Sequence, residues 1–188
     1  MKFEQRYSPA SLREMESEFE RIMRPAVTGI EWRMLNGLSG KEAFRDIIVV
    51  RFEGSCEGDE RKSNPLRSRF LGFTYEENGQ VLPFARIDCS KILGLLALQS
   101  SDEAKGIFHV QQMLGRAMGR VLAHEAYHAI LQTTVHAARG IARPSLTLSE
   151  LFGPELRFDS PEIAALNTAL SQPSSGKLIS AAITLPLL

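Results

Sequence analysis

The spacing of apolar residues along the 188-residue chain predicts helices on either side of a group of short strands. Apolar residues recur at helical spacing from Leu12 to Ile22, and again from Ile107 to Leu131, which is the longest predicted element. Between these helices, β-branched or alternating runs bounded by turn residues predict strands. The expected strands cover residues 30–34, 47–52, 70–75 and 81–87, with 47–52 at the centre of the sheet.

Shorter patterns complete this prediction. Asn78-Gly79 is a hairpin signal between the last two strands, and a short apolar helix is expected over residues 90–98. Two further short helices are expected around residues 149–151 and 162–170, and residues 171–188 are expected to be a tail that is packed or frayed. The order of elements predicts one α+β domain over residues 1–188, with a mainly helical C-terminal part.

Composition and charge exclude several classes of function. Lys plus Arg and Asp plus Glu are both 22, so no surplus positive charge supports binding to nucleic acid or to an anionic membrane surface. No apolar run approaches the ~18 residues of a membrane span. The first residues, MKFEQRYSPA, contain no signal-peptide core, so we expect export only if the chain is a processed form. The oligomeric state is not predicted.

The two cysteines, Cys56 and Cys89, are too few for a disulfide framework and do not form a CxxC motif. A single Cys56–Cys89 bridge is expected if the compartment is oxidising. Two free buried thiols are the alternative.

The candidate chemistry lies inside the long helix, where residues 124–128 read His-Glu-Ala-Tyr-His and match HExxH. Positions four apart differ by about 40° around a helix, so His124 and His128 leave the same face and can share one zinc ion. Glu125 is rotated by about 100° from His124, where it can act on a metal-activated water without being a ligand. The alternative is a pair of core histidines hydrogen-bonded to backbone or carboxylate groups.

A catalytic zinc site needs a third protein ligand and one open position. His136 is the only histidine downstream of His128, eight residues later. On a continuous helix it would lie about 12 Å further along the axis, so the chain must leave the helix between Leu131 and Val135. We therefore expect zinc ligands at His124, His128 and His136.

Two stretches resemble a group of bacterial zincin-type metallopeptidases. They are GRAMGRVLAHEAYHAILQTTVHAARGIARPSLTLSEL, residues 115–151, and the strand pair LGFTYEENGQVLPFARIDC, residues 71–89. In that group HExxH is followed by a third histidine after an extended spacer, and then by a segment like Gly140–Arg143. The resemblance implies a zincin-like fold with a small mixed or antiparallel sheet. It also implies a metzincin-like site formed by His124, Glu125, His128 and His136.

The sequence departs from the metzincin pattern HExxHxxGxxH in three ways. His136 follows His124 by twelve residues instead of ten, the glycine is absent, and Ala142 stands where a methionine below the metal is expected. A thermolysin-like arrangement, with a downstream carboxylate as third ligand, is the competing hypothesis. Its candidates are Glu150 and Glu155.

These residues predict a zinc-dependent metallopeptidase in which Glu125 is the general base. The substrate is expected to be a peptide or protein lying extended against the edge of the 70–75 and 81–87 hairpin. Two alternatives remain open: a zinc hydrolase acting on a non-peptide amide or ester, and a non-catalytic zinc-binding domain.

Overall fold

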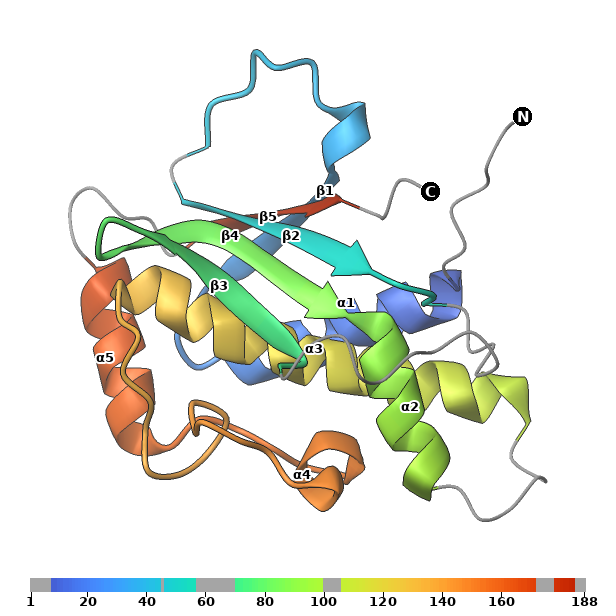
Figure 1. Cartoon of the computed structure of the whole chain (residues 1–188). Helices are drawn as coiled ribbons and strands as arrows, with labels where there is room; N and C mark the ends of the chain where they lie inside the picture. Colours follow the sequence, from blue (N-terminus) through green and yellow to red (C-terminus); the bar gives the residue numbers. More distant parts are fainter. Residues whose placement is uncertain (1–7, 45, 57–69, 100–105, 172–177, 185–188) are drawn as a thin grey trace.

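The computed structural model describes residues 8–44, 46–56, 70–99, 106–171 and 178–184. These residues form one α+β unit in which a mixed five-stranded sheet lies above the helices (Figure 1). The elements are α1 (Pro9–Met23), β1 (Gly29–Met34), the 3-10 turn η1 (Leu35–Gly37), β2 (Ile47–Glu53), β3 (Gly72–Glu77), β4 (Gln80–Asp88), α2 (Cys89–Gln99), α3 (Ile107–Leu131), α4 (Leu148–Phe152), α5 (Ser160–Leu170) and β5 (Leu178–Thr184).

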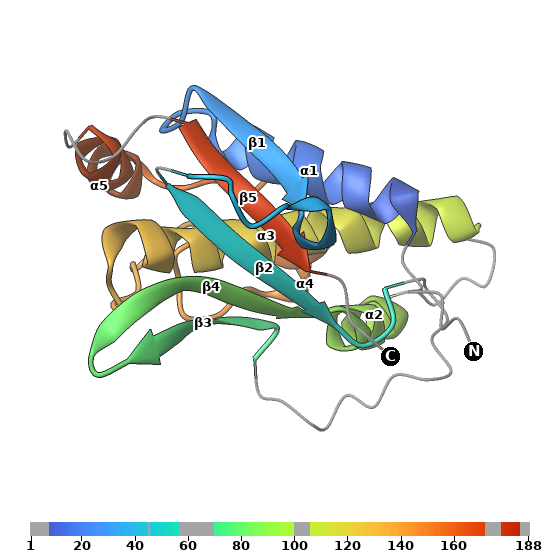
Figure 2. The same ribbon diagram turned by 90° about the horizontal axis from the view of Figure 1, so that it is seen from above.

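The strand order is β1-β5-β2-β4-β3, which is visible from above in Figure 2. The first four strands in this order are parallel to their neighbours, and β3 runs antiparallel to β4 at the edge of the sheet. The expected hairpin is confirmed, because Asn78 and Gly79 both adopt positive φ, 53° and 77°, as a type I′ turn requires. The expected central position of the 47–52 segment, in β2, is also confirmed.

The prediction of a C-terminal tail is wrong for residues 178–184. They form β5, which is inserted between β1 and β2 and is parallel to both. Ala181, Ala182 and Ile183 are buried, so the strand shows none of the apolar–polar alternation that marks a half-exposed strand. A short apolar run at the end of a chain therefore gave no signal of its place in the sheet. The remainder of the expected tail, 172–177 and 185–188, lies outside the described residues.

Helix α3 crosses beneath the sheet and packs closely against α1 (Figure 2). A Cβ atom added at Gly115 would lie 2.4 Å from the Ser11 carbonyl oxygen, and one added at Gly119 would lie 2.8 Å from that of Met15. The glycines therefore allow the two helix backbones to approach. None of the described helices is both long and apolar enough to cross a bilayer.

A disulfide bond joins Cys56, just beyond β2, to Cys89 at the start of α2. Both cysteines are buried, and their Cα atoms are 5.1 Å apart. The bridge closes a loop with a sequence separation of 33, for which chain entropy predicts a stabilisation of about 3–4 kcal/mol. Of the two thiol states expected from the sequence, the structure has the bridged one.

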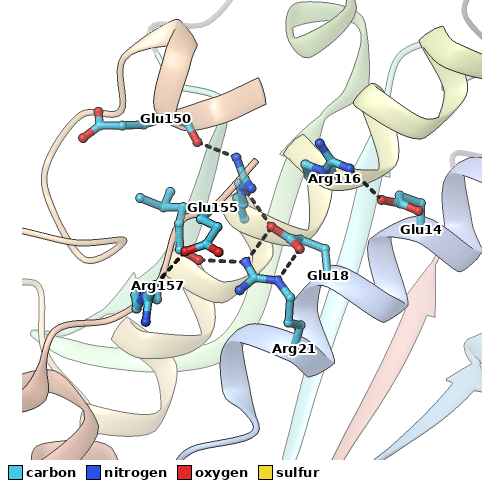
Figure 3. A network of polar contacts seen from close by, with 9 residues as sticks. Glu14, Glu18, Arg21, Arg116, Glu150, Glu155 and Arg157 are labelled. Atoms are coloured by element: carbon cyan, nitrogen blue, oxygen red, sulfur yellow. Dashed lines mark hydrogen bonds and ion pairs between the residues drawn. The ribbon is translucent and has the colours of Figure 1, made fainter. Parts of the chain in front are cut away.

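A buried ionic network ties α1 and α3 to the segment that follows the candidate site (Figure 3). Arg120 of α3 is fully buried and donates a 2.6 Å hydrogen bond from Nε to Glu18 of α1. Glu18 also accepts two hydrogen bonds from Arg21. The same two arginines donate to the backbone carbonyls of Glu150 and Leu156. The network therefore fixes the segment 150–156 at Glu150 against α3, which carries HExxH, and at Leu156 against α1.

We expect Glu18→Gln to lower the free energy of unfolding by about 3 kcal/mol, because it leaves the buried Arg120 charge uncompensated. Burial raises the pKa of Glu18, but the hydrogen bonds from Arg21 and Arg120 outweigh it and hold that pKa below 4.5. The stabilisation is therefore present above pH 4.5 and lost as the pH falls through the lowered value. Urea unfolding at neutral and acidic pH measures both effects.

Glu14→Gln is the matched control for Glu18→Gln. Glu14 pairs with Arg116 at 3.6 Å, and both side chains are about a quarter exposed, so the loss should be below about 1 kcal/mol. Equal losses in the two variants would contradict a special role for the buried pair.

Candidate metal centre

The HExxH motif occupies the C-terminal third of α3, as the periodicity predicts. The apolar stripe of this helix, which includes Leu114, Ala117 and Val121, is buried and continues onto His124 and His128. His128 is only 6% exposed, His124 is half-buried, and Glu125 on the neighbouring face is 4% exposed. The motif therefore places three polar side chains at the end of a buried apolar face, where each needs a partner.

The chain leaves the helix at Gln132, inside the window expected from the position of His136. Gln132 adopts a left-handed conformation (φ 51°), and its backbone N–H donates to the His128 carbonyl oxygen. The side chain of Gln132 also donates a 2.6 Å hydrogen bond to the Ala129 carbonyl oxygen. This turn does without the glycine of the metzincin pattern, because hydrogen bonds to the last helical turn offset the strain of a non-glycine residue there.

The turn brings His136 back to the two helix histidines. The candidate ligand atoms of His124, His128 and His136 all lie within 4.8 Å of one another, so the group could hold a metal ion. Ring centroids are 4.8 Å apart for His124–His128, 5.2 Å for His124–His136 and 4.7 Å for His128–His136. His136 is exposed, so the cluster opens to solvent on the side of this ring.

Backbone carbonyls fix the orientation of both helix histidines. Nδ1 of His124 lies 2.8 Å from the Ile141 carbonyl oxygen, and Nδ1 of His128 lies 2.7 Å from that of Thr133. A carbonyl oxygen only accepts hydrogen bonds, so each Nδ1 carries the proton and each Nε2 presents a lone pair. Metal-binding histidines in proteins are held in the same way.

The two lone pairs face each other. Nε2 of His124 and Nε2 of His128 are 3.1 Å apart, and two acceptor nitrogens cannot hydrogen-bond without a proton between them. Two nitrogens at about 2.0–2.1 Å from a tetrahedral zinc ion are about 3.4 Å apart, close to this separation. A cation bound by both lone pairs therefore fits this geometry, whereas a hydrogen bond between the two rings does not.

Burial keeps the helix histidines neutral, which is the form that binds metal. Burial lowers the pKa of His124 to about 4, against the hydrogen bond to the Ile141 carbonyl, which raises it. Burial likewise lowers the pKa of His128, and the neighbouring His136 lowers it further. Both rings are therefore uncharged at neutral pH even without a bound ion.

The carboxylate of Glu125 is held by a residue of the sheet and not by one of its own helix. Its Oε2 accepts a 2.7 Å hydrogen bond from the Thr74 hydroxyl of β3. Burial raises the pKa of Glu125 to about 7, and the hydrogen bond from Thr74 opposes this shift. A carboxyl group that titrates near neutrality can both accept and return a proton.

The two carboxylates considered as alternative ligands are engaged elsewhere. Oε2 of Glu150 accepts hydrogen bonds from Thr147, which caps α4, and from Arg143. Glu155 is 69% exposed and pairs with Arg157. Among the described residues, the group that could hold a metal contains neither carboxylate, so the geometry favours His136 as the third ligand.

Sequence reasoning missed the residues that orient this site. The carbonyls of Thr133 and Ile141 leave no mark on side-chain patterns, because every residue carries one. Ala142, expected where other sites have a methionine, is buried next to Ile141, whose carbonyl contacts His124. Thr74 could have been considered from the sequence, because it lies in the strand expected at the sheet edge. A threonine hydroxyl there can donate a hydrogen bond to a buried glutamate of the helix below.

No protein-family model matches the chain, and no curated protein or solved structure resembles it at a significant level. The resemblance to zincin-type metallopeptidases therefore remains a prediction from the quoted residues, to be judged on the geometry of the site.

Proposed function

We propose that this chain is a zinc-dependent metallopeptidase with a zincin-like fold. The observation that carries the proposal is the pair of Nε2 lone pairs held face to face by backbone carbonyls, with a third imidazole beside them. The buried Glu125, whose pKa burial raises to about 7, lies at the adjacent position of the same helix. Three imidazoles are the protein ligands of a catalytic zinc site with one open position, and a neighbouring glutamate can act on the water held there.

Zinc is the metal that best suits these donors. Imidazole nitrogens favour zinc over calcium or magnesium, which prefer oxygen ligands. A structural zinc site uses four protein ligands, whereas the described residues gather three and expose one of them to solvent. This count supports a catalytic site over a purely structural one.

Bound zinc would acidify water and polarise a substrate carbonyl. The residues of the chain then have defined tasks. Glu125 accepts the proton of the attacking water and later returns it to the leaving amine, which its pKa of about 7 allows. The Thr133 and Ile141 carbonyls keep His128 and His124 in the tautomer that binds the ion.

The edge strand β3 supports a peptide as the substrate. Within the described residues, β3 pairs only with β4, so its other edge has unpaired backbone groups. Thr74 on this strand contacts Glu125, so the free edge lies beside the proposed base. An extended peptide that pairs with this edge would place one of its backbone carbonyls at the site. A small ester has no extended backbone that could pair with the strand.

Purified protein should hydrolyse a mixed peptide library only when it is loaded with zinc. A chelator should abolish turnover, and stoichiometric zinc should restore it, because the base alone cannot polarise the carbonyl. Library turnover followed by mass spectrometry measures this, and a parallel panel of simple esters and non-peptide amides shows which class is cleaved. Cleavage of the panel but not of the library would replace the peptidase with a non-peptide hydrolase. Zinc binding without turnover of either would contradict a catalytic function.

A further inference from the structure

Strand β3 contacts the proposed base through two residues on one face, Gly72 and Thr74. Residues two apart on a strand point to the same side, and here that side faces α3. The intervening Phe73 points the other way, beneath the guanidinium of Arg86. Both contacts reach Glu125 from a different part of the chain, 51 residues away in the case of Thr74.

The Thr74 hydroxyl has two acceptors on Glu125. It lies 2.7 Å from the carboxylate Oε2 and 3.0 Å from the backbone carbonyl oxygen of the same residue. A hydroxyl has one hydrogen to donate, and the shorter distance and the carboxylate acceptor favour Oε2. Oε1 has no hydrogen-bond partner in the described part of the chain. Oε2 of Glu125 therefore accepts a hydrogen bond from the described residues of the protein, whereas Oε1 does not.

Gly72 leaves room for this arrangement. A Cβ atom at this position would lie 2.6 Å from Cγ1 of Val121 and 3.0 Å from Oε1 of Glu125. Any larger residue would have to move the strand, the Val121 side chain or the carboxylate. The glycine thus lets β3 approach α3 closely enough for Thr74, two residues on, to reach Oε2.

We propose that Thr74 is a positioning residue for Glu125: it holds Oε2 and leaves Oε1 free to accept the proton of the attacking water. This inference rests on the proposed peptidase function. The hydroxyl limits rotation of a buried carboxylate that is otherwise tethered only through its own side chain. Misplacement of a reacting group by about 1 Å costs about 100-fold in rate, so the loss of this hydrogen bond should be visible in kcat.

The contact is tested first without reference to activity. Carbon NMR of protein with isotope-labelled glutamate gives the side-chain carboxyl resonance of Glu125, assigned by its disappearance in Glu125→Gln. The resonance should shift in Thr74→Val, in both metal-free and zinc-loaded protein, and stay near its original position in Thr74→Ser. Thr168→Val is the matched control, because the exposed Thr168 hydroxyl donates only to the Ala164 carbonyl of α5. An unchanged resonance in Thr74→Val would overturn the proposal.

The consequence for catalysis is tested on the peptide cleaved fastest in the library. In Thr74→Val, kcat should fall about 10- to 100-fold, with KM and zinc affinity unchanged, and Thr74→Ser should recover most of the loss. Thr74→Ala, which is smaller, should behave like Thr74→Val. An unaltered kcat, or an equal loss in the serine and valine variants, would overturn the positioning role. If the resonance shifts in Thr74→Val but the wild-type protein cleaves nothing, the proposed function is overturned, and the catalytic role of Thr74 with it.

Discussion

Glu125→Gln should reduce peptide hydrolysis by about 10²–10⁴-fold, or about 3–5 kcal/mol of transition-state stabilisation. Glutamine keeps the size of the side chain and can still accept the hydrogen bond that Thr74 donates to Oε2. It cannot take a proton from water. Because the three imidazoles are untouched, the zinc content and the thermal unfolding temperature should remain close to those of the wild-type protein. Turnover of the same peptide at matched zinc occupancy measures the effect.

Glu155→Gln is the matched control for this experiment. Glu155 is 69% exposed and pairs with the similarly exposed Arg157, so its loss should leave hydrolysis unchanged. Equal rates for wild type and Glu125→Gln would show that Glu125 is not the base. A loss of zinc in Glu125→Gln would instead show that its carboxylate binds the ion.

The site could be predicted as far as helical geometry determines it. HExxH places two imidazoles on one face, and this follows from the period of the α-helix alone. The end of the helix before His136 could also be predicted, since on a straight helix a gap of eight residues would place His136 beyond the reach of an ion bound by the other two. The fold was predictable to a similar extent: long periodic segments such as 107–131 become helices because one face must be buried.

The remainder of the site depends on contacts between distant segments. The Ile141 carbonyl reaches His124 because the Ile141 backbone N–H is itself held by the Arg157 carbonyl. The residue before Arg157, Leu156, is anchored in turn by Arg21, which lies 135 residues away and pairs with Glu18. No local pattern encodes such a chain of contacts. The same reason explains β5, whose partners β1 and β2 are more than a hundred residues away in sequence.

These hydrogen bonds between distant segments also explain why His136, although exposed, can belong to a well-defined site. His136 lies on an irregular segment, but the Ala137 N–H donates to the Ala142 carbonyl oxygen, which closes the following turn. Gly140, with φ 65°, completes this turn, and a Cβ atom there would lie 2.8 Å from the Arg157 carbonyl oxygen. The loop is therefore positioned by Arg157, next to Leu156, whose carbonyl oxygen Arg21 holds.

His136→Ala should weaken zinc binding by about 100-fold or more. Structural zinc sites bind with about 10–16 kcal/mol spread over four ligands, so one ligand accounts for about 3 kcal/mol. Because His136 is exposed, its removal costs little core packing, and the fold should survive the substitution. Competition with a chromogenic chelator measures the affinity, and elemental analysis measures the occupancy.

Two control variants separate this result from a general effect on the protein. His109→Ala removes an exposed histidine from the first turn of the same helix, outside the group of three, and should leave zinc affinity unchanged. Glu150→Ala removes the competing carboxylate and should cost only its part in the cap of α4 and its partly exposed ion pair with Arg143, about 1 kcal/mol of stability. If His136→Ala kept its zinc while Glu150→Ala lost it, the third ligand would be a carboxylate brought in by a rearrangement of residues 143–150. The lone pairs of His124 and His128 would still share the ion in that case, so only a variant of one of these two residues tests whether the helix face binds the metal at all.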